Sequence, residues 1–147
     1  MSATSDGYAG DVAARDAWDT LQAHPAAVLV DVRTRAEWSY VGVPSLASIG
    51  KETLLVSWDD FCSGTLVPDF AGRLTAVLEE KGVGRDAPIY FICRSGARSR
   101  NAAIAATAAG YERCFNVESG FEGALGPDRH RATPGSWKAA DLPWIQS

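Results

Sequence analysis

The sequence lacks the marks of a membrane or secreted protein. None of its apolar runs approaches the roughly 20 residues that a membrane-spanning helix needs, and residues 1–7 contain neither the basic nor the apolar region of a secretory signal. It has only three cysteines, with no CxxC pair and no nearby histidine pattern. This argues against a disulfide scaffold and against a structural zinc site. We therefore expect a cytoplasmic protein with no membrane contact and no metal.

Positive charge is also scarce. The 14 Lys and Arg residues are outnumbered by 18 Asp and Glu residues, which gives a formal net charge of −4. This balance argues against nucleic acid as a partner, but it leaves room for a small cluster of arginines. The 147 residues, 46% of them hydrophobic and 22% charged, contain no internal repeat and no linker. We therefore expect a single folded domain over residues 1–147.

Four stretches carry the signals of helices. Polar caps, apolar residues at helical spacing and a terminal Gly or Pro define two of them, and a capping box defines a third, shorter one. The fourth is rich in alanine, which has the highest helix propensity. The predicted helices run from a cap at Asp11 to about Ala23, from a cap at Thr34 to about Tyr40, from Pro68 or Asp69 to Gly82, and from Ser99 to Gly110.

Short apolar runs between these helices predict strands that are buried on both faces. The runs are 27–32, 88–92 and 114–117, with a further candidate at 54–58, whereas 42–50 is rich in turn residues and 59–68 is predicted to be a loop. Strands that alternate with helices indicate an α/β fold with a parallel sheet. Ligands of such sheets bind beyond the carboxyl ends of the strands, where Asp31, Arg33 and Cys93 all lie.

Cys93 heads a loop that connects a buried strand to a helix. The backbone N–H groups of residues 94–99 can point inward as a cradle of donors, and the helix that starts at Ser99 adds a partial positive charge. Arg94 and Arg98 add full charges. These features together favour the thiolate form of Cys93, which is a nucleophile.

The alternative is that Cys93 is a small buried hydrophobe, as a lone cysteine after an apolar strand often is. The arginines and Gly96, which can adopt a backbone angle that a side chain would hinder, favour the nucleophile. Cys62 and Cys114 lack such surroundings, so we expect them to be structural.

The segment Cys93-Arg94-Ser95-Gly96-Ala97-Arg98-Ser99 resembles the active-site loop of the single-domain rhodanese family. The likeness extends over residues 10 to about 145. Its other hallmarks are Asp31-Val32-Arg33 followed by Glu37-Trp38, and a closing segment of Asn116-Val117, Gly120, Trp137 and Leu142-Pro143.

Two places depart from the family's pattern. Val41-Gly42-Val43-Pro44 stands where the family usually has Gly-His-Ile-Pro, so the histidine is missing. The span from Gly120 to Trp137 is longer than usual, and we interpret residues 122–136 as an insertion. With its Arg129-His130-Arg131 segment, this insertion is either a solvated loop or a basic flap near the site.

The resemblance implies a rhodanese-like fold, in which a mostly parallel five-stranded sheet is flanked by helices on both faces. It also implies a thiosulfate sulfurtransferase-like enzyme without a metal or organic cofactor. Cys93 would carry sulfur as a persulfide from a small anionic donor to cyanide, a thiol or a protein acceptor. The substrate-binding residues would be Arg94, Ser95, Gly96, Ala97, Arg98 and Ser99.

Several neighbouring residues are expected to support this site. Ser99 is predicted to cap the helix, and Asp31 could accept hydrogen bonds that fix the Cys93 loop or Arg98. Arg33 could pair with Glu37 or line the mouth of the site. For both Asp31 and Arg33, an ordinary ion pair at the strand end is an equal alternative. Four tryptophans either wall the entrance or pack in the core, namely Trp38, Trp58, Trp137 and Trp144.

Loop length separates this chemistry from two related reactions. Four residues lie between Cys93 and Arg98, and Ile92 precedes the cysteine. Cysteine phosphatases have five residues in that interval and typically a histidine before the cysteine. A phosphatase or arsenate reductase is therefore the less favoured alternative, and a non-enzymatic persulfide carrier or sensor is another.

Overall fold

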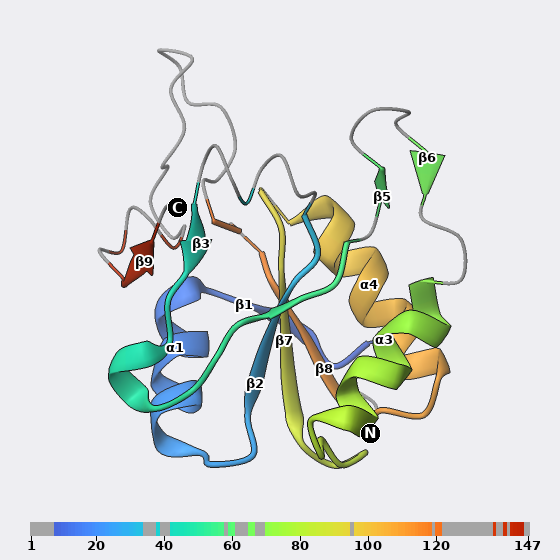
Figure 1. The fold of residues 1–147 in the computed structure, drawn as a ribbon, viewed down its shortest axis with the longest axis horizontal. Helices are drawn as coiled ribbons and strands as arrows, with labels where there is room; N and C mark the ends of the chain where they lie inside the picture. The colour runs from blue at the N-terminus through green and yellow to red at the C-terminus, as the bar shows by residue number, and fades with distance from the viewer. Residues whose placement is uncertain are drawn as a thin grey trace.

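The computed structural model describes residues 8–33, 38, 42–57, 59–60, 65–66, 70–94, 96–118, 120–121, 137, 140 and 142–145. Its centre is a five-stranded sheet in the order β1-β8-β7-β2-β4, in which neighbouring strands pair in parallel (Figure 1). The strands are β1 (Gly10–Val12), β2 (Val28–Asp31), β4 (Leu54–Leu55), β7 (Pro88–Ile92) and β8 (Arg113–Val117). The predicted α/β fold with a five-stranded parallel sheet is confirmed.

Helices cover both faces of this sheet, as predicted (Figure 1). α1 (Ala14–Ala23) lies on one face, and α3 (Phe70–Glu80) and α4 (Ala97–Ala108) lie on the other. Side chains alternate between the faces along a strand, so Leu29 of β2 packs under α1 while its neighbour Val30 packs under α3 and α4. Because both faces are covered, all five residues of the central strand β7 are buried.

The amino-terminal edge of the sheet differs from the prediction. The expectation that Asp11 caps the first helix is wrong, because residues 10–12 form the edge strand β1 beside β8 and α1 begins at Ala14. The Asp11 carboxylate instead accepts hydrogen bonds from the Tyr8 hydroxyl at 2.7 Å and from the Asn116 amide at 3.0 Å. A polar residue before an amphipathic run is typical of a helix cap. The pairing of residues 10–12 with β8 depends on the tertiary fold, so the local sequence does not reveal it.

Two small strand pairs include segments where the sequence predicts turns or a loop. β3 (Val43–Pro44) pairs antiparallel with β9 (Trp144–Ile145), and β5 (Asp59–Asp60) pairs antiparallel with β6 (Thr65–Leu66). A short 3-10 helix, η1 (Ala47–Ile49), follows β3. Strands of two residues are too short to carry an alternating pattern, so the sequence does not reveal them.

Some predicted features lie outside the described residues. They are the helix at 35–40 apart from Trp38, the insertion at 122–136, and Trp58 and Cys62. Within the described part of the chain, no helix is both long and apolar enough to cross a membrane.

Cys114 of β8 lies fully buried in the core under α3 and α4. Burial raises the pKa of its thiol from an ordinary value of 9.0 to about 11. A raised folded-state pKa contributes stability that is fully present below pH 9 and is lost as the pH rises towards 11. We therefore expect the free energy of unfolding in urea to fall by about 2 kcal/mol from this group between pH 8 and pH 10.5.

The Cys114→Ala variant provides the control, because it has no thiol to ionise at this position. The free energy of unfolding of the variant should lack the decrease at alkaline pH that comes from this thiol. The difference in unfolding free energy between the two proteins should therefore narrow as the pH rises. Parallel pH profiles for the variant and the parent protein would show that Cys114 is not held as a neutral thiol.

Candidate active site at the end of the central strand

Three strands deliver their carboxyl ends to the neighbourhood of Cys93. Asp31 of β2 is the register partner of Ile92, the last residue of β7, so the Asp31–Arg33 segment lies beside Cys93. The chain that follows β8 returns to the same place, because the N–H of Phe121 donates to the carbonyl oxygen of Cys93 at 2.8 Å. The candidate site is therefore assembled by β2, β7 and β8 together.

The sulfur of Cys93 is surrounded by hydrogen-bonding groups. The N–H groups of Gly96 and Ser99 lie 3.1 Å and 3.4 Å from Sγ, and the hydroxyl oxygen of Ser99 lies at 3.2 Å. These amides belong to the start of α4, where the first N–H groups of a helix have no partner within it. They point at the sulfur instead, and with the partial positive charge of the helix start they favour a negative charge there.

Two glycines let the backbone close around this loop. Gly96 has a φ of 109° and Gly120 a φ of 62°, both in the left-handed region that favours glycine. A Cβ on Gly96 would collide with the carbonyl oxygen of Glu118. A Cβ on Gly120 would lie 2.5 Å from the carbonyl oxygen of Arg94 and 2.6 Å from that of Cys93. The chain after β8 therefore packs directly on the backbone of the Cys93 loop.

Ser99 does not cap the helix. The prediction is wrong because α4 begins two residues earlier, at Ala97, with Gly96 in the capping position. Ser99 is fully buried in the first turn, and its hydroxyl donates to Oδ1 of Asn116 at 2.5 Å. Asn116 is not among the site residues that the sequence predicts. Its signal in the sequence is a polar side chain within an apolar strand, where burial requires hydrogen-bond partners.

The other predicted loop residues differ in exposure. Arg94 is exposed and Arg98 is half-buried, and both follow Cys93 within five residues. Ala97 contributes the first helical residue of α4. Ser95 lies outside the described residues. The loop thus presents the Arg94 side chain to solvent and keeps that of Arg98 partly buried, whereas Cys93 itself is only 1% exposed.

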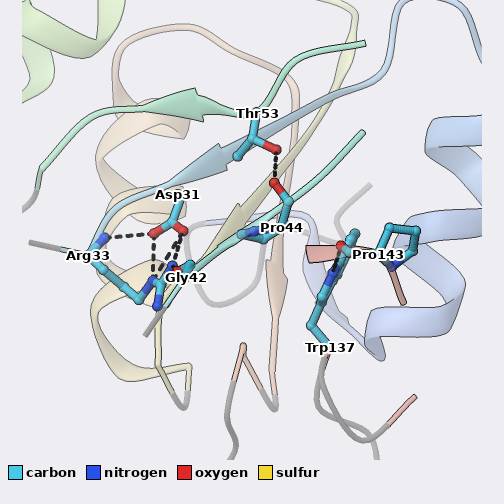
Figure 2. A network of polar contacts seen from close by, with 7 residues as sticks. All are labelled: Asp31, Arg33, Gly42, Pro44, Thr53, Trp137 and Pro143. Atoms are coloured by element: carbon cyan, nitrogen blue, oxygen red, sulfur yellow. Dashed lines mark hydrogen bonds and ion pairs between the residues drawn. The ribbon is translucent and has the colours of Figure 1, made fainter. Parts of the chain in front are cut away.

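Asp31 and Arg33 form an ion pair with both side chains fully buried (Figure 2). Nη2 of Arg33 lies 2.7 Å from Oδ2 of Asp31, and Nε lies 3.0 Å and 3.1 Å from the two carboxylate oxygens. The backbone N–H of Arg33 also donates to Oδ1 at 3.0 Å. In the part of the chain that the structure describes, this carboxylate is engaged by Arg33 and not by the Cys93 loop. The other predicted partner of Arg33, Glu37, lies outside that part.

Arg33 also fixes the segments that border the site. Its Nη2 donates to the carbonyl oxygen of Gly42 at 2.6 Å, and its guanidinium lies 4.4 Å above the ring of Phe121. Pro44, two residues after Gly42, accepts a hydrogen bond from the Thr53 hydroxyl at 2.8 Å (Figure 2). One buried arginine therefore connects the end of β2 to β3 and to the turn after β8.

The tryptophans that the structure describes near the carboxyl terminus have different roles. Trp137 is fully buried, meets Trp18 edge-on with ring centroids 5.9 Å apart, and donates from Nε1 to the carbonyl oxygen of Pro143 at 2.7 Å (Figure 2). Trp144 is 40% exposed and meets Phe121 edge-on at 5.9 Å. Trp137 thus belongs to the core, and Trp144 lies at the surface beyond Phe121.

Cys114 shows what a structural cysteine looks like in the same fold. Its thiol donates only a long hydrogen bond, 3.6 Å, to the carbonyl oxygen of Tyr111, whereas the Cys93 sulfur faces two N–H groups and a hydroxyl. Among the described residues, no three His, Cys, Asp or Glu side chains gather as metal ligands would.

Comparison with known proteins identifies the family. A model described as the rhodanese-like domain matches residues 13–125, more than half of the chain. The protein of Rickettsia rickettsii named as the RP600 homolog is 38% identical over 134 residues, which make up 91% of this chain and 95% of that protein.

Two solved structures resemble most of the chain. The crystal structure of Rv0390 from M. tuberculosis is 44% identical, covers 95% of this chain and 99% of its own, and superposes with a TM-score of 0.84. The polysulfide-sulfur transferase of Wolinella succinogenes, solved as a homodimer in solution, is 21% identical with a TM-score of 0.56, covering 93% of this chain and 78% of its own. At that identity the second likeness concerns the fold alone.

Replacing Gly120 tests how closely the turn after β8 packs on the Cys93 loop. Gly120→Ala should lower the free energy of unfolding by about 3 kcal/mol, since it combines an unfavourable left-handed alanine with an overlap against backbone atoms that must shift. Urea denaturation followed by circular dichroism measures this loss.

Gly50→Ala is the matched control. Gly50 has a similar φ of 72°, but an added Cβ would meet nothing within 4 Å. Gly50→Ala should therefore lower the free energy of unfolding only by the cost of an alanine in the left-handed backbone conformation, about 1 kcal/mol. Equal losses for the two variants would show that Gly120 is not packed against the loop.

Proposed function

This chain belongs to the family of rhodanese-like domains, and we propose that it is a sulfurtransferase that carries sulfane sulfur on Cys93 as a persulfide. The observation that carries the proposal is the set of groups aimed at Cys93 Sγ. The backbone N–H groups of Gly96 and Ser99 lie 3.1 Å and 3.4 Å from that sulfur. A persulfide anion needs such donors, because the buried site offers it little water.

The first half-reaction loads the enzyme. The Cys93 thiolate attacks the outer sulfur of thiosulfate, forming the Cys93 S–S bond and breaking the bond between that sulfur and the sulfonate, so that sulfite leaves with the bonding electron pair. Arg94 and Arg98 provide positive charge for the dianionic donor as it approaches and for the sulfite as it departs.

The second half-reaction unloads it. Cyanide or a thiolate, either free or on an acceptor protein, attacks the outer sulfur, and the electrons of the S–S bond return to Cys93 as a thiolate. The products are thiocyanate or a new persulfide. This is covalent ping-pong catalysis that uses only side chains and backbone of this chain. A reducing compartment such as the cytoplasm would keep Cys93 free for it.

Asp31 and Arg33 act in this proposal through positioning and do not touch the reacting sulfur. Their ion pair holds the end of β2 beside Cys93 and holds Phe121, whose backbone N–H donates to the Cys93 carbonyl. This hydrogen bond limits how far the Cys93 backbone can move when the persulfide forms on its side chain.

Incubation with thiosulfate followed by intact mass spectrometry tests the function. The protein should gain about 32 Da, the mass of one sulfur atom, and lose it on addition of cyanide with release of thiocyanate. Cys93→Ala should abolish the adduct, and the matched cysteine variant Cys114→Ala should retain it, because Cys114 holds its proton at neutral pH.

An adduct that survives Cys93→Ala would reject Cys93 as the sulfur carrier. Rapid hydrolysis of p-nitrophenyl phosphate or reduction of arsenate, without any sulfur transfer, would favour the phosphatase or reductase alternative. A stable adduct that small acceptors do not remove, but that one protein does, would favour a carrier over an enzyme with broad acceptors.

A further inference from the structure

A chain of hydrogen bonds leads from the Cys93 sulfur to the edge of the sheet. Sγ lies 3.2 Å from Oγ of Ser99, and that hydroxyl lies 2.5 Å from Oδ1 of Asn116. Nδ2 of Asn116 lies 3.0 Å from Oδ1 of Asp11, and the Tyr8 hydroxyl donates to the same oxygen at 2.7 Å. The chain crosses from the start of α4 through β8 to β1, so it joins three elements that are distant in the sequence.

The carboxylate at its far end sets the direction of every bond. An ionised carboxylate only accepts hydrogen bonds, so Asn116 must turn its NH2 group towards Asp11 and its carbonyl oxygen towards Ser99. A serine hydroxyl has a single proton, and Ser99 gives it to that carbonyl. The remaining contact of Ser99, with Cys93, is then satisfied only if the thiol of Cys93 is the donor.

The two backbone N–H groups favour a sulfur anion, but the Ser99 hydroxyl in this orientation does not. When Cys93 loses its proton, the sulfur keeps the two backbone donors, Gly96 and Ser99, but Ser99 must rotate its hydroxyl away from Asn116 to add the third. That rotation leaves Oδ1 of Asn116 buried without a donor, and an unsatisfied buried acceptor is costly.

We propose that Asn116, oriented by Asp11, is a positioning residue that withholds the Ser99 hydroxyl from the resting Cys93 sulfur. This inference rests on the proposed function, because it concerns which hydrogen bonds are available to the sulfur that is that function's nucleophile. The positive charges of Arg94 and Arg98 attract the anionic form, and the Asp11–Asn116–Ser99 chain opposes them.

Among the described residues, further charged groups lie on the elements around this chain of hydrogen bonds. On α4, Arg100 donates from Nε to the Tyr8 hydroxyl at 3.3 Å. On β2, Asp31 and Arg33 are paired with each other. After β8, Glu118 is exposed.

Tyr8 stays neutral in the range of the experiment. Burial, followed by its hydrogen bond to Asp11, raises the pKa of Tyr8 above its ordinary value of 10.0. Asp11 is thus the group whose charge orders the chain.

The test is the alkylation of Cys93 by iodoacetamide, followed by mass spectrometry of the Cys93 peptide across pH. In Asp11→Asn the acceptor-only constraint is gone, so Asn116 can turn its amide and Ser99 can donate to the sulfur. The rate at pH 7 should rise about threefold to tenfold, and the midpoint of the pH–rate profile should move to lower pH. A rate that stays the same or falls overturns the proposal.

A second background separates the hydrogen bond from the lost charge. In Ser99→Ala the hydroxyl is absent, so Asp11→Asn should change the rate much less there, by no more than about twofold from charge alone. An equal rise in both backgrounds overturns the proposal. Asn116→Ala, which removes the competing acceptor, should give the same Ser99-dependent rise.

Asp16→Asn is the matched control, because Asp16 is an exposed carboxylate on α1. It loses the same charge and should leave the rate unchanged. The Cys114 peptide reports folding in every sample, since it stays unlabelled while the core is closed. A Ser99-dependent rise in the alkylation rate, without any persulfide on Cys93, would reject the proposed function and keep this inference. A persulfide on Cys93 without that rise would keep the proposed function and reject this inference.

Discussion

The interaction on which the structure depends is the convergence of hydrogen-bond donors on the Cys93 sulfur. It arises because β7, a strand buried on both faces, ends immediately before Cys93, and the chain then turns into α4, whose first N–H groups have no partner in the helix. Gly96 permits that turn at a φ of 109°, and Gly120 permits the chain after β8 to close against it. Each feature is ordinary for a parallel α/β sheet, and only their coincidence at one sulfur makes a site that can hold a negative charge.

The buried pair of Asp31 and Arg33 provides the frame for this loop. Two charges in the core lose hydration, so the pair is not an obvious source of stability, but removing either partner would leave a buried charge uncompensated at a cost of about 3–5 kcal/mol. The role of the pair is to position neighbouring segments. The Arg33 guanidinium contacts the carbonyl oxygen of Gly42 and the ring of Phe121, and the N–H of Phe121 donates to the Cys93 carbonyl oxygen. The frame and the nucleophile are therefore one connected unit, although they lie 60 residues apart in the sequence.

Much of this could be predicted from the sequence, and the limits have physical reasons. The continuous apolar run at 88–92 predicts the central strand, because that strand is buried on both faces. Helical spacing predicts the buried face of α1, made by Ala14, Ala17, Trp18 and Leu21, and the alternation of strands and helices predicts the α/β architecture. The roles of Asp11 and Asn116 could not be predicted, because each depends on a partner from another strand. The sequence predicts the wrong helical position for Ser99 for a related reason. A serine near a helix start is typical of a cap, and only the path of the loop decides which residue occupies the capping position.

The central claim is that the Cys93 loop holds an added sulfur atom as an anion, and a crystal structure after treatment with thiosulfate tests it most directly. We predict electron density for one extra sulfur bonded to Cys93 Sγ, with the N–H groups of Gly96 and Ser99 still within hydrogen-bonding distance of the persulfide. Extra sulfur on Cys114, or a persulfide on Cys93 that has swung out of the loop and lost both N–H groups, would contradict the account.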